Sequence, residues 1–249
     1  MKISCLTITQ LSRRELLERC VYSYSRQSIA SGRRELIIVH HDGRPGTLAI
    51  QGVLSKFSVE AEVVAVPPAP LGSLRNTSLR HARNELLCQW DDDDVYHPDR
   101  LLLQSLPFGD SECRATSLDS QLVWFTDRKE LYIRRGGREG IHGTVMFRNG
   151  MGLRYDSTLS KGEDSRFMEE MLALGASGVH RIDGHPELYV RTYHGQNTWA
   201  FEHHYKQSLR GLSADWLSEN EARVRGWLRV LEIPSVRVRD AHRVAFTVD

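Results

Sequence analysis

The chain has 249 residues, of which 40% are hydrophobic, so it can bury a sizeable core as one domain or as one domain with an appendage. Its 33 Lys and Arg balance 32 Asp and Glu, and a net charge of +1 disfavours general nucleic-acid binding. No apolar run approaches the length of a membrane span, and the N-terminus lacks the pattern of a signal peptide. We therefore expect a cytoplasmic protein. The four cysteines form no CxxC pair, which favours buried thiols over a disulfide frame or a zinc site.

The first hundred residues alternate between predicted strands and predicted helices. Apolar and β-branched runs predict strands at 2–9, 35–39, 59–66 and 86–90. Apolar residues at helical spacing, together with turn signals, predict helices at 13–27, 48–57 and 72–84. This order predicts an α/β fold with a mostly parallel central sheet and helices on both faces. Such sheets bind ligands at the carboxyl ends of their strands.

Polar clusters fall at three of these strand ends, namely Thr9-Gln10, His40-His41-Asp42 and Asp91 to Asp94. Their common position predicts one shared site. Four adjacent carboxylates repel one another, and a hard divalent cation such as Mg²⁺ or Mn²⁺ would remove that conflict. The plainer interpretation is a solvated acidic turn. The preceding strand and the following 96–101 segment, in which Pro98 predicts a helix start, favour a site.

Glycine-rich phosphate-binding motifs are missing from the sequence. Neither GxGxxG after the first strand nor GxxxxGK[ST] occurs, so a dinucleotide fingerprint and a P-loop are both excluded. Any phosphate would have to be held by metal and arginine.

The second half has a different pattern. Paired antiparallel strands are predicted at 121–125 and 130–134, with further strands at 143–148 and 188–192. Gly162-Glu163-Asp164 opens a helix, and Asn197 is the predicted N-cap of another that runs to Arg210. An amphipathic helix at 213–231 and an extended tail follow. We expect this helix to pack on its own domain or on a second copy of the chain, because it carries much apolar surface.

Four motifs together resemble family-2 glycosyltransferases with the GT-A fold. Asp91 to Leu101 matches the DxD motif with its Pro-Asp-Arg-Leu tail, and Gly162-Glu163-Asp164 matches a Glu-Asp motif at a helix start. Arg75-Asn76 resembles the end of the family's Gly…Ala-Arg-Asn helix, and 194–198 resembles a later segment. The resemblance covers most of residues 1–200. It implies a GT-A domain at 1–212, with a nucleotide-binding half at 1–100 and an acceptor-side half with a small antiparallel part at 101–212. The 213–249 helix and tail form an appendage.

The resemblance also implies an activity and a set of site residues. The activity is metal-assisted, inverting sugar transfer from a nucleotide-diphosphate sugar, UDP-sugar by default, to a hydroxyl of a saccharide or glycoconjugate, as in polysaccharide biosynthesis. Asp164 would be the catalytic base, and Asp93 with His194 would hold Mn²⁺ or Mg²⁺. The donor would contact Thr9, Asp42, Arg75, Asp91 and Asp92. Asp42 matches the family's paired acids only if one residue is inserted. A homodimer or peripheral membrane association would be compatible with this reading.

Simpler structural roles are also possible for three of these residues. Asp164 could cap its helix within a Ser160-x-x-Glu163 capping box, His194 could be an ordinary loop histidine, and Arg75 could be solvated. Other functions also remain open: a sugar nucleotidyltransferase, a metal phosphohydrolase, or a glycosyltransferase-like binding module without activity. The intact Asp91, Asp93 and Asp164 disfavour the last of these.

Overall fold

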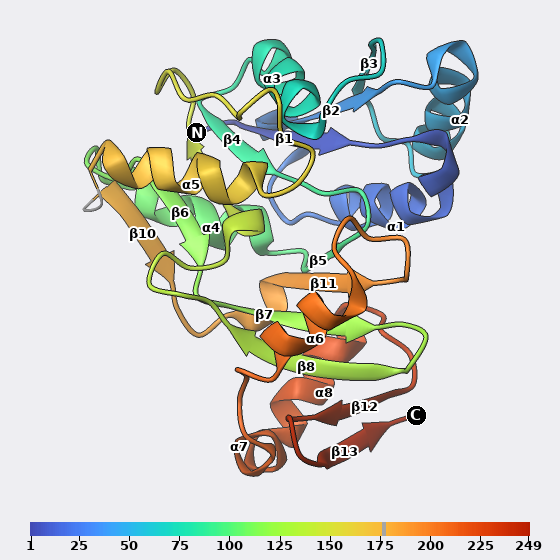
Figure 1. The fold of residues 1–249 in the computed structure, drawn as a ribbon, viewed down its shortest axis with the longest axis vertical. Helices are drawn as coiled ribbons and strands as arrows, with labels where there is room; N and C mark the ends of the chain where they lie inside the picture. Colours follow the sequence, from blue (N-terminus) through green and yellow to red (C-terminus); the bar gives the residue numbers. More distant parts are fainter. Residues whose placement is uncertain (176–177) are drawn as a thin grey trace.

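Two β-sheets organise the chain, and the computed structural model describes residues 1–175 and 178–249 (Figure 1). The first sheet has seven strands, and all but β9 run in the same direction. In spatial order they are β10 (Val179–Ile182), β6 (Ala115–Leu118), β9 (Met146–Arg148), β4 (Leu86–Gln89), β1 (Ile3–Ile8), β2 (Arg34–His40) and β3 (Glu62–Ala65). The predicted α/β fold with a mostly parallel sheet is confirmed.

Helices cover both faces of this sheet because its central strands are apolar on both sides. In β2, Leu36 and Ile38 belong to one apolar cluster, while Ile37 and Val39 belong to the cluster on the other face. The first cluster contains α1 (Arg14–Ser25), α2 (Gly43–Lys56) and α4 (Arg100–Ser105). The second contains α3 (Leu71–His81) and α5 (Glu163–Ala173). Because β1, β2 and β4 run in parallel, the polar residues that follow them lie at the same edge of the first sheet.

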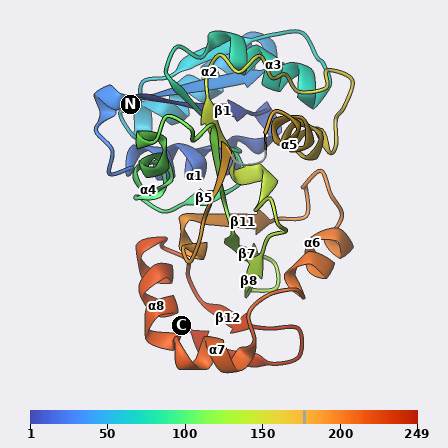
Figure 2. The ribbon, with the colours of Figure 1, turned by 90° about the vertical axis from the view of Figure 1, so that its left-hand side faces the viewer.

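The second sheet lies below the first in Figure 2 and begins directly after the acidic run. Its strand order is β13 (Val244–Val248), β12 (Val236–Arg239), β8 (Glu130–Arg135), β7 (Ser120–Phe125), β11 (Tyr189–Tyr193) and β5 (Val95–Tyr96). The predicted β7–β8 antiparallel pair is present. The two-residue strand β5 was not predicted, and it fixes the chain immediately after Asp94 by pairing with β11.

The C-terminal segment is part of this second layer. The predicted single helix at 213–231 is wrong: the segment forms α7 (Ala214–Glu219) and α8 (Glu221–Val230). Asn220 separates them, since its backbone is non-helical (φ −108°, ψ 18°) and its side chain donates to the Trp216 carbonyl at 2.9 Å. The tail then forms the β12–β13 hairpin, and β12 pairs in parallel with β8.

Three other local predictions need correction. Helix α2 begins at Gly43, earlier than predicted, because Pro45 is tolerated in a first turn, where its missing N–H needs no partner. Asn197 is not a helix cap, since α6 (Phe201–Ser208) starts later and Ala200 is its N-cap. The first half of the predicted strand at 143–148 is occupied by a 3₁₀ turn, His142–Thr144. All four cysteines are buried thiols. Among the described residues, no helix is both long and apolar enough to cross a bilayer.

Deleting residues 213–249 should expose the second sheet and make the chain insoluble. Leu217, Val224, Leu228 and Val236 are at most 1% exposed and share one apolar cluster with β7 and β8. The deletion would also remove β12 from one side of β8, so that β8 becomes an exposed edge strand, which is a template for aggregation. Soluble yield and melting temperature measure the effect. A soluble truncation with the melting temperature of the full chain would contradict this packing.

Candidate active site

The four aspartates lie in a loop that is fixed at both ends by buried groups. At its start, the Thr7 hydroxyl donates to the Trp90 carbonyl at 2.7 Å, and the Tyr96 hydroxyl donates to the Asp91 carbonyl at 2.7 Å. The Trp90 and Tyr96 rings stack with centroids 3.8 Å apart. The fully buried Arg100 guanidinium lies over both rings. Cation–π contacts of this kind stabilise a desolvated charge, so the loop starts from a rigid base.

Asp94 anchors the other end of the loop. Its carboxylate accepts hydrogen bonds from the Tyr189 hydroxyl and, at 2.8 Å, from the Thr192 backbone N–H. Burial, followed by the neighbouring Asp93 charge, raises the pKa of Asp94 well above its usual range. Both partners belong to β11, so Asp94 connects the acidic loop to the second sheet. Its contacts indicate a structural role.

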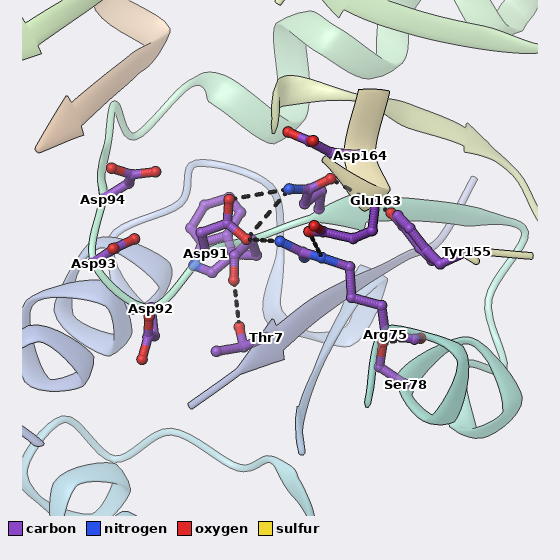
Figure 3. A network of polar contacts seen from close by, with 12 residues as sticks. Thr7, Arg75, Ser78, Asp91, Asp92, Asp93, Asp94, Tyr155, Glu163 and Asp164 are labelled. Atoms are coloured by element: carbon purple, nitrogen blue, oxygen red, sulfur yellow. Dashed lines mark hydrogen bonds and ion pairs between the residues drawn. The ribbon is translucent and has the colours of Figure 1, made fainter. Parts of the chain in front are cut away.

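Arg75 connects three elements in the centre of the site (Figure 3). Its Nη2 donates to Asp91 Oδ1 at 2.9 Å, and its Nε donates to Glu163 Oε1 at 3.0 Å. Arg75 and Glu163 are 7% and 4% exposed, so the solvated role considered for Arg75 is wrong. Burial raises the pKa of Glu163, although the Arg75 charge opposes that shift. Helix α3 thus holds the acidic loop and the start of α5 in a fixed relation.

Arg13, in the segment after β1, forms ion pairs with both Asp92 and Asp93. Arg13 Nη1 lies 2.6 Å from Asp92 Oδ1, and Arg13 Nη2 lies 2.5 Å from Asp93 Oδ2. The Thr9 hydroxyl also donates to Asp92 Oδ2 at 2.7 Å. Burial and the nearby Asp93 charge raise the pKa of Asp92 to about 7. For Asp93, burial acts to raise the pKa, but the His194 hydrogen bond and the Arg13 charge outweigh it and lower the pKa to about 2.

Asp164 lies in the first turn of α5, as predicted. Its Oδ1 accepts a hydrogen bond from the Ser165 N–H at 2.8 Å. The capping box considered as an alternative role is not formed, because Gly162 is the N-cap and the helix has no side-chain cap. Gly162 has φ +75°, in the left-handed region that glycine adopts without strain. This turn sets the direction in which Glu163 and Asp164 leave the helix start.

A cavity of about 270 Å³ joins these groups. Thr9, Arg75, Asp91, Asp92, Asp93 and Asp164 all line it, whereas Asp42 and His194 do not. Asp42 instead accepts a hydrogen bond from the Leu11 N–H at 2.7 Å. His194 contacts Asp93, which itself lines the cavity.

Several lining residues were missed by sequence reasoning: Arg13, Lys161, Arg191, Asn197 and Trp199. Asn197 was assigned to a helix cap, yet its side chain donates to the Thr192 carbonyl at 2.9 Å and approaches Asp93 at 3.4 Å. Trp199 is 36% exposed and stacks on His203 with ring centroids 4.4 Å apart. The available signal was proximity in the sequence, because each basic or aromatic residue in this set lies within about five residues of Thr9, Asp164 or His194.

Two protein groups are suited to a divalent cation. His194 Nε2 and Asp93 Oδ2 lie 3.3 Å apart, which gives an imidazole and a carboxylate side by side. Across residues 1–175 and 178–249, no set of three or more His, Cys, Asp or Glu side chains is arranged as metal ligands. A cation that also binds phosphate oxygens and water needs few protein ligands, so this donor pair fits such an ion.

Comparison with known families gives the family of the chain. The model of glycosyl transferase family 2 matches residues 5–130, just over half of the sequence. The chain belongs to glycosyl transferase family 2. The match includes the acidic loop and Arg75, and it ends before Asp164. It assigns this family 2 protein to the transferases.

Solved structures share the fold of this family 2 chain at low sequence identity. Staphylococcus aureus TarS 1–349 in complex with UDP has a TM-score of 0.60 and 14% identity, with 91% of this chain and 74% of TarS 1–349 covered. The mannosyltransferase PcManGT from Pyrobaculum calidifontis, in complex with GDP-Man and Mn²⁺, has a TM-score of 0.59 and 14% identity. That comparison covers 90% of this chain and 64% of PcManGT. A search of curated proteins finds no match.

Proposed function

We propose that this protein is an inverting glycosyltransferase that moves a sugar from a nucleotide-diphosphate sugar to an acceptor hydroxyl. One observation carries the proposal: Asp164, at the start of α5, lines the same cavity as Asp91 to Asp93, at the end of β4. A donor held by the acidic loop would therefore present its sugar toward a carboxylate on a different element. Arg75 holds the two sides in a fixed relation through its contacts with Asp91 and Glu163.

The proposed reaction uses Asp164 as a general base. The acceptor oxygen attacks the anomeric carbon from the face opposite the diphosphate and passes its proton to the Asp164 carboxylate. A bond forms between that oxygen and the anomeric carbon. The bond to the diphosphate oxygen breaks, and the electron pair leaves with the diphosphate. Arg191 and Lys161 line the cavity and supply positive charge near the developing anion.

The proposed cofactor is Mn²⁺ or Mg²⁺ held by Asp93 and His194. When bound, such an ion supplies Lewis-acid stabilisation of negative charge on the leaving diphosphate. The Asp93 carboxylate is the type of ligand that suits Mn²⁺ and Mg²⁺. The PcManGT structure was determined with Mn²⁺ and GDP-Man, which supports the same type of cofactor here.

The donor nucleotide is proposed as UDP, with Thr9, Asp91 and Asp92 on the donor side of the cavity. The Thr9 hydroxyl and the Asp92 carboxylate are already joined by a 2.7 Å hydrogen bond, so they would meet a ribose or sugar hydroxyl as a unit. The role proposed for Asp42 needs a movement of the 40–43 segment, because its carboxylate is bonded to Leu11 outside the cavity. Related folds were solved with UDP and with GDP-Man, so both bases belong in any test.

The products distinguish this function from the alternatives. With a panel of UDP- and GDP-sugars, Mn²⁺ and mixed saccharide acceptors, we expect release of nucleoside diphosphate that increases when acceptor is added. A nucleotidyltransferase would instead release pyrophosphate from a nucleoside triphosphate and a sugar phosphate. A phosphohydrolase would release inorganic phosphate without an acceptor. Either of these results, in place of nucleoside diphosphate release, would overturn the proposal.

A further inference from the structure

Arg13 occupies the Asp93 carboxylate that the proposed cation would need, and it also contacts the neighbouring Asp92. It is the last residue of a 3₁₀ turn, Leu11–Arg13, directly after the strand β1 and its Thr9. One guanidinium nitrogen contacts Asp92 and the other contacts Asp93, at 2.6 and 2.5 Å. The side chain of Arg13 is 17% exposed, and those of Asp92 and Asp93 are 2% and 15% exposed. Charge-assisted pairs of this kind, short and shielded from water, are strong.

Three side-chain nitrogen atoms surround a single oxygen of Asp93. Besides Arg13 Nη2, Asp93 Oδ2 lies 3.3 Å from His194 Nε2 and 3.4 Å from Asn197 Nδ2. A carboxylate oxygen has only about two lone-pair directions to offer. The nearest and charged donor is Arg13. A divalent cation bound to this oxygen beside His194 would lie next to the guanidinium, and because two positive charges repel one another, the ion and Arg13 compete for Asp93.

We propose that Arg13 is a displaceable positioning residue that competes with the divalent cation for Asp93. This inference rests on the proposed function, since that function requires a cation at Asp93. In the metal-free chain, the guanidinium cancels the repulsion between Asp92 and Asp93 and keeps both side chains in place. On cation binding, the ion takes over that role and Arg13 is released.

The released guanidinium remains next to the donor. Arg13 lines the same cavity as Arg75, Arg191 and Lys161, so a nucleoside diphosphate would offer it a new anionic partner. The diphosphate and the cation then favour the same rearrangement. Two ligands that favour one state strengthen each other's binding by the same factor. Without Arg13, part of this cooperativity should be lost.

The test is a titration of the folded chain with Mn²⁺, in which the free ion is measured by electron paramagnetic resonance. Arg13→Gln should bind Mn²⁺ about tenfold more tightly or better than the unmodified chain, because the strong competing pair is gone. Arg13→Lys keeps the charge but not the planar fork, and should also bind more tightly. Arg14→Gln, an exposed neighbour, is the charge-matched control and should bind as the unmodified chain does.

Two outcomes would overturn the competition. In the first, Arg13→Gln binds Mn²⁺ no more tightly than the unmodified chain does. In the second, Arg13→Gln and Arg14→Gln gain Mn²⁺ affinity equally, which would show that the gain comes only from the long-range effect of removing one positive charge. Adding UDP to each titration should strengthen Mn²⁺ binding less in Arg13→Gln than in the unmodified chain. If neither the unmodified chain nor any variant binds Mn²⁺, and the unmodified chain still releases nucleoside diphosphate, then the role of Arg13 is rejected while sugar transfer is retained.

Discussion

Replacing Asp164 with Asn should lower sugar transfer by about a hundredfold or more, because the variant has no proton acceptor for the attacking hydroxyl. The fold should be nearly unaffected. Asn keeps the Oδ1 atom that accepts the Ser165 N–H bond at 2.8 Å, so the free energy of unfolding should fall by less than about 1 kcal/mol. Donor affinity should also change little, because the proposed donor contacts come from Thr9 and the acidic loop and not from α5. Turnover, melting temperature and donor affinity are measured together.

The control for this variant is Glu169→Gln, an exposed carboxylate on the same helix, which should transfer sugar at the normal rate. If Asp164 only satisfied the start of α5, turnover would follow the amount of folded protein. Near-normal turnover of Asp164→Asn would remove Asp164 as the base. Glu163 would be the next carboxylate to consider, although Arg75 already engages it at 3.0 Å.

Replacing Asp93 with Asn should abolish the effect of Mn²⁺ on nucleotide binding. The variant keeps the shape of the side chain but loses the anionic oxygen that lies 3.3 Å from His194 Nε2. Mn²⁺ affinity should fall by about tenfold or more, since even groups that only support a metal ligand are worth that much. Calorimetry with UDP, with and without Mn²⁺, measures both effects.

The matched control for Asp93→Asn is Asp127→Asn, in the exposed turn between β7 and β8, which should bind as the unmodified chain does. Arg13 also contacts Asp93, so the melting temperature of the variant must be recorded without ligand. Unchanged Mn²⁺ and UDP affinities in a folded Asp93→Asn variant would show that the cation binds elsewhere.

The sequence predicts the first sheet well because its signals are local. Apolar strands, helical spacing and the break at each strand end give β1, β2 and β4, and the carboxyl ends of parallel strands must share an edge. The same rule brings Thr9 and Asp92 into contact, as the 2.7 Å hydrogen bond confirms. The second sheet is harder to predict, since β12 pairs with β8 about a hundred residues earlier, and no local pattern records that pairing.

The polar contacts of the site depend on tertiary placement, which is why sequence reasoning found some residues and missed others. Arg13 follows the first strand, yet its partners lie about eighty residues later. Asn197 resembles a helix cap, but the chain offers its amide the Thr192 carbonyl and Asp93 instead. Asp42 has a suitable position in the sequence, but a hydrogen bond to Leu11 keeps it outside the cavity.

Donor binding by the unmodified chain tests the proposed transferase most directly, and a melting-temperature screen of UDP- and GDP-sugars with and without Mn²⁺ measures it. A ligand that binds only the folded state raises the melting temperature, and the rise grows with the logarithm of the ligand concentration above its Kd. We expect a clear rise with at least one nucleotide sugar, larger when Mn²⁺ is present than the sum of the two separate shifts. No rise with any nucleotide sugar, at concentrations where Mn²⁺ is saturating, would contradict a donor site in the cavity formed by Asp91 to Asp93 and Asp164.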